Sequence, residues 1–290
     1  MEKPAQKGST PAVKTGGNVR GIKNAFLVIV ACFIIAWCLF LFVFGAPSHF
    51  DFDGDGDFSG ASMWFADSDL KYHPNDLIGT IFKGGIIVPV LQTLFLTVIV
   101  LSVERWIALG SAKGKGNITT FVRNVKACLA KNDIEGAQAL CAKQKGSVAA
   151  VVSAALVRYK EMDENTTLSK EQKVATLQKE VEEATAMEMP SLQQNLPIVA
   201  TLTTLGTLVG LLGTVIGMIK SFQALSASGA PDSTELSTGI SEALVNTAFG
   251  IATGAFAVIS YNFYTNKIDN LTYAIDEIGY SIVQTFAANH

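Results

Sequence analysis

The chain has 290 residues, of which 49% are hydrophobic and 16% charged, with a formal net charge of −3 and a mean hydropathy of +0.34. A soluble domain carries roughly a quarter charged residues, so this composition argues against a soluble globular protein. The deficit is concentrated in four nearly uncharged stretches, as is typical of a multi-pass membrane protein. The four cysteines show no short paired spacing, which argues against a disulfide framework or a zinc site.

The four apolar stretches are long enough to cross a membrane. They cover residues 25–44, 84–103, 197–219 and 243–264. Each reaches the ~20 residues that about 30 Å of hydrocarbon requires at roughly 1.5 Å per residue. Backbone groups in lipid must be bonded within their own segment, so all four are predicted to be helices. The predicted fold class is therefore an all-α integral membrane protein with four transmembrane helices.

The segments between the spans differ sharply in charge. Residues 1–24 hold five basic residues and one acid, and residues 104–196 hold thirteen basic residues. Residues 45–83 hold two lysines against seven aspartates, and residues 220–242 have Lys220 as their single basic residue. Because basic segments stay in the cytoplasm, the two termini and the 104–196 domain are predicted to be cytoplasmic. The 45–83 and 220–242 loops are predicted to be periplasmic.

The N-terminal segments allow two interpretations. Residues 1–24 are rich in Gly, Pro, Ser, Thr and Lys and are predicted to be disordered. The 25–44 stretch follows basic residues and precedes Gly45-Ala46, so a cleaved signal peptide competes with a retained helix. Its apolar core is about twice the length expected of a signal peptide, which favours the retained helix.

The inner domain, residues 104–196, is predicted to be helical. Asn132-Asp133 reads as a cap between two helices, and Ser169 opens a segment rich in helix formers. That segment predicts one long helix that runs into the third span, with kinks at Pro190 and Pro197. The tail, residues 265–290, carries apolar residues at helical spacing and is expected to pack against the inner helices.

The first periplasmic loop contains aspartates at alternate positions, namely Asp51, Asp53, Asp55 and Asp57. This spacing resembles the first half of a calcium loop, in which carboxylate oxygens converge on one ion. The glutamate expected at the twelfth position is replaced by Ser62, so a solvated acidic loop is favoured over a calcium site. Enzyme signatures are absent and the three histidines are scattered outside the spans, so neither catalytic residues nor a cofactor are expected.

Small and hydroxyl residues share one face in each of the last two spans. In the third span this face holds Thr207, Gly210, Thr214 and Gly217, flanked by Gly206 and Gly213. In the fourth span it holds Thr247, Gly250, Gly254, Ala257 and Tyr261. Close helix packing explains the glycines, whereas two aligned hydroxyl stripes can line a narrow wet path.

The third and fourth spans contain no Asp, Glu, Lys, Arg or His; Lys220 and Glu242 lie at their ends. Proton relays in membranes require a titratable group. If protons pass along these helices, another chain must supply the carrier.

Three motifs resemble the ExbB/TolQ/MotA proton-channel family, with ExbB as the closest resemblance. They are Gly210-Leu-Leu-Gly-Thr-Val-Ile-Gly217 followed by Phe222, Gly239-Ile-Ser-Glu-Ala-Leu-Val-Asn-Thr-Ala-Phe-Gly250 followed by Tyr261-Asn262, and Val103-Glu-Arg-Trp106. The resemblance covers roughly residue 89 to the C-terminus.

The resemblance implies a pentamer in the bacterial inner membrane, assembled around the single transmembrane helices of two ExbD- or TolR-like partners. A partner aspartate would carry the proton past Thr214 and Thr247, and Glu242 would contact the partner. Proton flow would turn the partner and transmit work to the periplasm or outer membrane. A TonB-like protein is a further candidate partner; membrane lipids are expected neighbours, and nucleic acid is not.

The sequence also departs from the family pattern. Thr207 and Phe256 stand where the family usually has prolines, and the first span with its acidic loop is an addition to the three-helix plan. Four spans also resemble the MotA stator. A TolQ-like or MotA-like subunit, a purely structural membrane scaffold and a stand-alone solute channel or transporter therefore remain alternatives.

Overall fold

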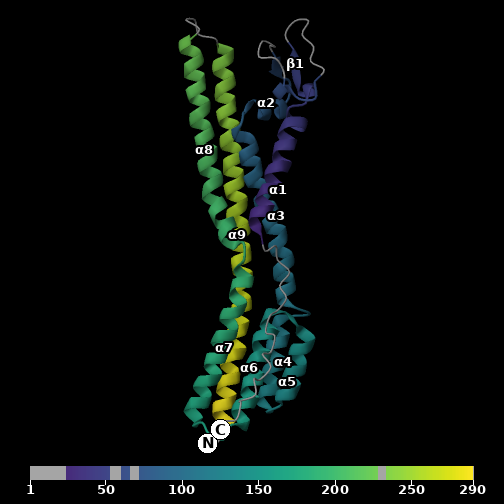
Figure 1. Ribbon diagram of the computed structural model, residues 1–290, viewed down its shortest axis with the longest axis vertical. Coiled ribbons are helices and arrows are strands. Elements are labelled where there is room, and N and C mark those ends of the chain that lie inside the picture. The colour runs from purple at the N-terminus through teal and green to yellow at the C-terminus, as the bar shows by residue number, and fades with distance from the viewer. Residues whose placement is uncertain (1–23, 53–59, 66–71, 228–232, 290) are drawn as a thin grey trace, which may run out of the picture. The chain divides into compact units, whose positions relative to one another are not determined.

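The computed structural model describes residues 24–52, 60–65, 72–227 and 233–289, and most of them are helical (Figure 1). The first helix, α1 (Ala25–Cys38), continues through a π-helical stretch, Leu39–Phe44. The other long helices are α3 (Ile87–Lys113), α8 (Leu196–Ala227) and α9 (Ser233–Asn289). Four helical stretches among the described residues are long and apolar enough to span a membrane. The prediction of an all-α membrane protein with four transmembrane helices is therefore confirmed.

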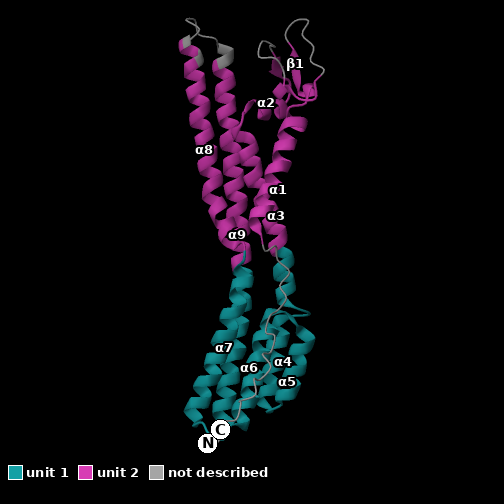
Figure 2. Cartoon of the chain, viewed as in Figure 1, with its two compact units in different colours: residues 1–21, 106–194, 266–290 teal, residues 22–105, 195–265 magenta. Residues whose placement is uncertain are grey.

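The chain divides into two compact units (Figure 2). The first, which we call the membrane unit, comprises residues 22–105 and 195–265 and holds the four apolar stretches. The second, which we call the helical unit, includes residues 106–194 and 266–290. Helices α3 and α9 contribute residues to both units.

A small hairpin follows α1 in the membrane unit. Strands β1 (Phe50–Phe52) and β2 (Tyr72–Pro74) pair antiparallel, with Asp51 opposite His73, and α2 (Leu77–Lys83) follows. The described residues from 39 to 85 are called the hairpin module below. Two short 3-10 turns, Pro47–His49 and Met63–Phe65, complete it.

Aromatic side chains hold the hairpin module together. The rings of Phe40 and Phe82 stack with centroids 4.9 Å apart, and Phe50 contacts the Phe82 ring edge-on at 5.7 Å. Met63 and Val88 complete this buried cluster. Such ring pairs add stability beyond the burial of their area, so a few aromatic residues can order a short module.

Helix α2 begins with a side-chain cap. The Asp76 carboxylate accepts a hydrogen bond from the Gly79 backbone N–H at 2.8 Å, and its second oxygen lies 2.6 Å from His49 Nδ1. The bond from Gly79 is the largest cause that lowers the pKa of Asp76. Ionised Asp76 therefore stabilises the first turn of α2.

The helical unit is built from α4 (Ile118–Ala130), α5 (Ile134–Gln144), α6 (Gly146–Glu164), α7 (Lys170–Gln193) and the end of α9. Asp133 caps α5 through the Gly136 N–H, and Ser169 forms a capping box with Gln172 at the start of α7. Both helix starts agree with the sequence prediction. The stripe of Ile and Leu residues in the α9 tail is buried, and the Phe286 ring contacts Tyr159 of α6 edge-on at 4.9 Å.

The connection from α7 to α8 differs from the predicted single helix. Helix α7 contains Pro190 and ends at Gln193, and α8 begins at Leu196. Asn195 between them has a φ of +65°, in the left-handed region that Asn tolerates better than most residues. Pro197 lies in the first turn of α8, where a missing N–H costs little. The kinked helix expected from sequence is thus two helices.

Candidate functional site

Helices α8 and α9 approach each other closely through their glycines. A Cβ atom on Gly250 would lie 2.7 Å from both Gly210 Cα and Gly206 O, and one on Gly210 would lie 2.8 Å from Gly250 Cα. A Cβ atom on Gly254 would lie 2.6 Å from Thr207 Oγ1. Only residues without side chains allow such backbone proximity.

The same contact extends further along the two helices. A Cβ atom on Gly213 would lie 2.5 Å from Asn246 Cβ, and one on Gly217 would lie 3.0 Å from Ala243 Cβ. Thus every glycine that the sequence singled out for helix packing lies at this interface.

Thr214 and Thr247 face each other across the interface. Their hydroxyl groups form a hydrogen bond, and both side chains are half-buried. Thr214 Oγ1 also lies 3.3 Å from Gly210 O, and Thr247 Oγ1 lies 3.2 Å from Ala243 O. Because a hydroxyl has a single proton, one of the two donates across the interface while the other can donate to its backbone carbonyl. The two hydroxyls are therefore adjacent in space although they come from different helices.

Thr207 lies two turns from Thr214 on α8 and does not join this pair. Its hydroxyl donates to Thr203 O of its own helix at 3.2 Å, and its side chain is exposed. A bond to the carbonyl four residues earlier is common for hydroxyls in helices. The structure therefore brings together two of the three threonines predicted to line a proton path.

A charged group lies near one end of the threonine pair. Glu242 Oε1 accepts a bond from Lys220 Nζ at 3.0 Å, and the Glu242 side chain is only 12% exposed. One turn further along α9, Asn246 is buried and donates from Nδ2 to Gly84 O at 3.2 Å. The sequence placed Lys220 and Glu242 at the ends of the two apolar spans; both lie within the longer helices α8 and α9, where they pair.

A buried ion pair in the membrane unit was missed by the sequence interpretation, which put Glu104 in the cytoplasmic domain. Arg105 is fully buried and donates from Nε to Glu104 Oε2 at 2.6 Å. Asn195 Nδ2 donates to the same carboxylate oxygen at 3.3 Å. The sequence signal that could have indicated this pair is an acid and a base side by side directly after an apolar stretch. Because buried charges are tolerated only when paired and hydrogen-bonded, we assign this cluster a structural role.

The candidate calcium site falls largely outside the described residues. Asp53, Asp55 and Asp57 are not among them, and the described Asp51 accepts a bond from Asn75 Nδ2 at 3.4 Å. No cluster of three or more metal-ligating side chains occurs in the part of the chain that the structure describes.

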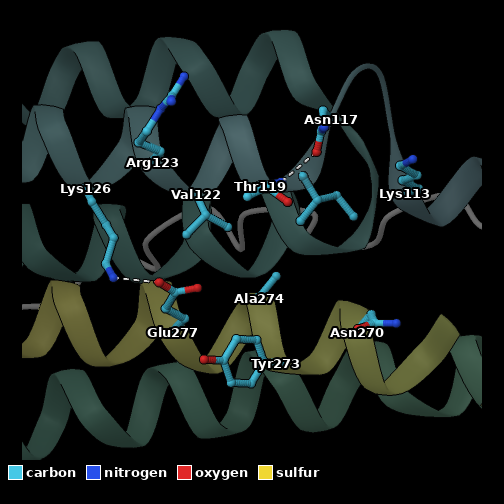
Figure 3. Close-up of a pocket in the computed structure, with 11 residues that line it drawn as sticks. Lys113, Asn117, Thr119, Val122, Arg123, Lys126, Asn270, Tyr273, Ala274 and Glu277 are labelled. Carbon is cyan, nitrogen blue, oxygen red and sulfur yellow. Dashed lines mark hydrogen bonds and ion pairs between the residues drawn. The ribbon is translucent and has the colours of Figure 1, made fainter. Parts of the chain in front are cut away.

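A cavity of about 610 Å³ lies in the helical unit between α4 and α9 (Figure 3). Lys126 reaches across it to Glu277, with 2.7 Å between Nζ and Oε1, whereas Arg123 points away. Glu277 is the one acid in the lining and is already paired. The lining therefore offers no free acid for proton transfer, and the hydroxyl pair of α8 and α9 is the better candidate site.

These features define a multi-pass helical membrane protein whose candidate site is an uncharged, hydroxyl-bearing helix pair with a charged pair near one end. Residues 138–277 match the sequence model of the MotA/TolQ/ExbB proton channel family. Over residues 138–277 this match confirms the resemblance noted from the motifs.

Individual relatives carry both ExbB and TolQ names. The chain is 38% identical over 93 residues to the putative biopolymer transport protein ExbB-like 3 of Synechocystis sp., covering 30% of this chain and 44% of that protein. It is 37% identical over 82 residues to the Tol-Pal system protein TolQ of Haemophilus influenzae, covering 28% and 36%. It is 35% identical over 77 residues to the biopolymer transport protein ExbB of Aquifex aeolicus, covering 27% and 52%. The chain thus spans about a third to a half of the length of these relatives.

Proposed function

We propose that the chain is the proton-channel scaffold subunit of an ion-driven motor in the bacterial inner membrane, of the ExbB type. It would couple the proton motive force, through an ExbD/TolR-like partner, to work at the periplasm or outer membrane such as energised transport. The observation that carries the proposal is the meeting of the Thr214 and Thr247 hydroxyls in two apolar stretches that contain no Asp, Glu, Lys, Arg or His.

A pair of hydroxyls suits a proton carrier that must change its charge. Each hydroxyl has one donor and two acceptor lone pairs. When a partner carboxylate is ionised, both hydroxyls can donate hydrogen bonds to it; when it is protonated, one hydroxyl can accept a hydrogen bond from the carboxyl O–H. The pair therefore supports both states of the carrier, while the carrier itself comes from the partner chain.

The apolar surface of the two helices supports an assembly within the membrane. Leu208 and Leu211 on α8 are 56% and 58% exposed, and Leu244 and Ile251 on α9 are 64% and 57% exposed. Such surface requires lipid, partner helices or further copies of the chain around it. The arrangement proposed is a pentamer around partner helices, with both termini cytoplasmic. A TonB-like protein is a further proposed partner.

The test removes one hydroxyl at a time at nearly constant volume. Thr214→Val and Thr247→Val should each lower partner-dependent proton flux in proteoliposomes, because a bond to a charged group contributes about 1.5–3 kcal/mol, or roughly 10- to 100-fold. Thr214→Ser and Thr247→Ser keep the hydroxyl and should retain most of the flux. Oligomer size by native mass spectrometry should not change.

A matched control lies on the same helix. Thr201 is exposed and donates to Pro197 O of its own helix at 2.9 Å, so Thr201→Val should leave the flux near that of the unaltered protein. Unaltered flux in both Thr214→Val and Thr247→Val would show that the hydroxyl pair does not line the path.

A purely structural scaffold is the second candidate, favoured by the glycine contacts of α8 and α9. Under that function both valine variants would be silent, whereas Gly213→Leu would disrupt the oligomer. A stand-alone channel would instead conduct ions after reconstitution without any partner. TolQ-like and MotA-like roles would use the same proposed site. They can be distinguished from an ExbB-like role by testing which partner protein restores proton flux to the reconstituted chain.

A further inference from the structure

The end of the hairpin module lies against Glu242 of α9. Helix α2 ends at Lys83, and Gly84 and Gly85 make the turn into α3. Gly85 has a φ of +71°, and a Cβ atom there would lie 2.8 Å from Glu242 Oε1. Gly84 O accepts the bond from Asn246 Nδ2 at 3.2 Å. The turn is therefore bonded to α9 through Gly84 and packs against Glu242 at Gly85.

One lysine bonds the Glu242 carboxylate, and a second lies at the end of the hairpin module next to the turn that contacts it. Lys220 Nζ donates to Oε1 at 3.0 Å. Lys83 is half-buried, with its Nζ 3.8 Å from the centroid of the Tyr72 ring. Burial lowers the pKa of Lys83, and the nearby Glu242 charge counters part of this effect. Each lysine thus brings a positive charge near the same carboxylate.

The core of the hairpin module sets the position of Lys83. Phe82, the preceding residue, is buried between the rings of Phe40 and Phe50. The backbone of Lys83 is therefore held between this cluster and the Gly84–Asn246 bond. The first span and the hairpin that follows it, which are additions to the three-helix plan, are therefore physically connected to the last helix.

We propose that Lys220, which bonds the Glu242 carboxylate, and Lys83, at the end of the hairpin module, are positioning residues for Glu242, so that the hairpin module controls how Glu242 meets a partner chain. This inference rests on the proposed function and deepens it. Glu242 precedes Thr247 by five residues, which is about 7.5 Å along a helix. The held carboxylate is thus close to the hydroxyl pair.

The same geometry specifies the chemistry of the partner group. Lys220 occupies Oε1, and no described residue bonds Oε2, so Oε2 is left to accept a hydrogen bond. Two lysines against one carboxylate leave a positive local charge, which disfavours a cation on the partner. The partner group is therefore a neutral donor: a hydroxyl, a side-chain amide or a backbone N–H.

The first experiment tests the geometry without any assay of function. Zero-length carbodiimide coupling of the purified full-length protein should join Lys220 Nζ to the Glu242 carboxylate as an amide, identified by peptide mass spectrometry. Lys220→Arg should abolish this product. If Glu242 couples to neither Lys220 nor Lys83 in the unaltered protein, the proposal is wrong.

The second experiment is a double-mutant cycle on partner-dependent proton flux. Lys83→Met should lower the flux ~5-fold, the upper range for a partly exposed charge pair, and Lys83→Arg should restore it. In a Glu242→Gln background, Lys83→Met should have no further effect. Lys131→Met, at an exposed lysine of the helical unit, should be silent. If the fold-reductions in flux caused by Lys83→Met and Glu242→Gln simply multiply in the double variant, the positioning role is wrong.

The two proposals fail in different ways. If the unaltered protein gives no partner-dependent flux, or both threonine-to-valine variants are silent, the proposed channel function fails while the coupling product still reports on Glu242. If the threonine variants lose flux but Lys83→Met acts independently of Glu242, the function stands and the positioning role fails.

Discussion

Replacing Gly250 by alanine tests the close contact of α8 and α9 most directly. The new Cβ atom would lie 2.7 Å from Gly210 Cα and from Gly206 O, whereas ordinary contact begins at 3.4 Å. Both neighbours are backbone atoms, so the helices must separate by about 0.7 Å or distort, the magnitude of overpacking that costs about 1–3 kcal/mol. Gly250→Ala should therefore lower the thermal unfolding midpoint of the detergent-solubilised protein and reduce partner-dependent flux.

Gly110→Ala provides the matched control for this substitution. Gly110 lies within α3, and a Cβ atom there would meet no atom within 4 Å. Alanine is favoured over glycine inside a helix by about 0.8–1.0 kcal/mol, so Gly110→Ala should raise the midpoint or leave it unchanged. A Gly250→Ala protein at least as stable as Gly110→Ala would refute the close-contact reasoning.

Two further predictions concern charges outside the threonine pair. Glu104→Ala removes the carboxylate that the fully buried Arg105 bonds, so thermal unfolding should show a loss of about 3–5 kcal/mol. Lys179→Ala, which removes an exposed i,i+4 pair, should cost less than about 0.5 kcal/mol. Equal losses in the two variants would contradict the structural role of the buried pair. Because the pKa of Asp76 is lowered in the folded protein, its contribution to α2 is present above the ordinary carboxyl pKa and is lost as the pH falls through the lowered value. The hydrogen-exchange protection of α2, taken relative to the intrinsic exchange rate at each pH, should therefore fall in acid. Asp76→Asn, which caps without titrating, should remove that dependence; an unchanged acid dependence in Asp76→Asn would count against the cap.

Local sequence signals predicted the helical architecture well. The four spans follow from uncharged apolar length alone, because lipid leaves the backbone no alternative to helix. The starts of α5 and α7 follow from Asp133 and Ser169, whose side chains bond backbone N–H groups only three residues away. These interactions are short-range and so can be read from the sequence.

Contacts between distant segments could not be predicted in the same way. The sequence placed Thr214 and Thr247 each on a small-residue face, but only the structure shows that the two faces meet. The strands of the hairpin module have three residues each, too few for an alternating pattern to be recognised. Kinks were expected at Pro190 and Pro197, whereas the helix ends at the residues before Asn195. The left-handed backbone conformation of Asn195 cannot be recognised from hydrophobic periodicity.

The glycine contact between α8 and α9 has a mechanical consequence. Because the two backbones are already in contact, they cannot slide past or tilt over one another without a clash. Neither water nor a helix of another chain has room to enter between them. Any rearrangement that accompanies a turnover cycle should therefore move α8 and α9 together as one rigid body. The relative motion should then occur at the surfaces where this pair contacts lipid or other helices.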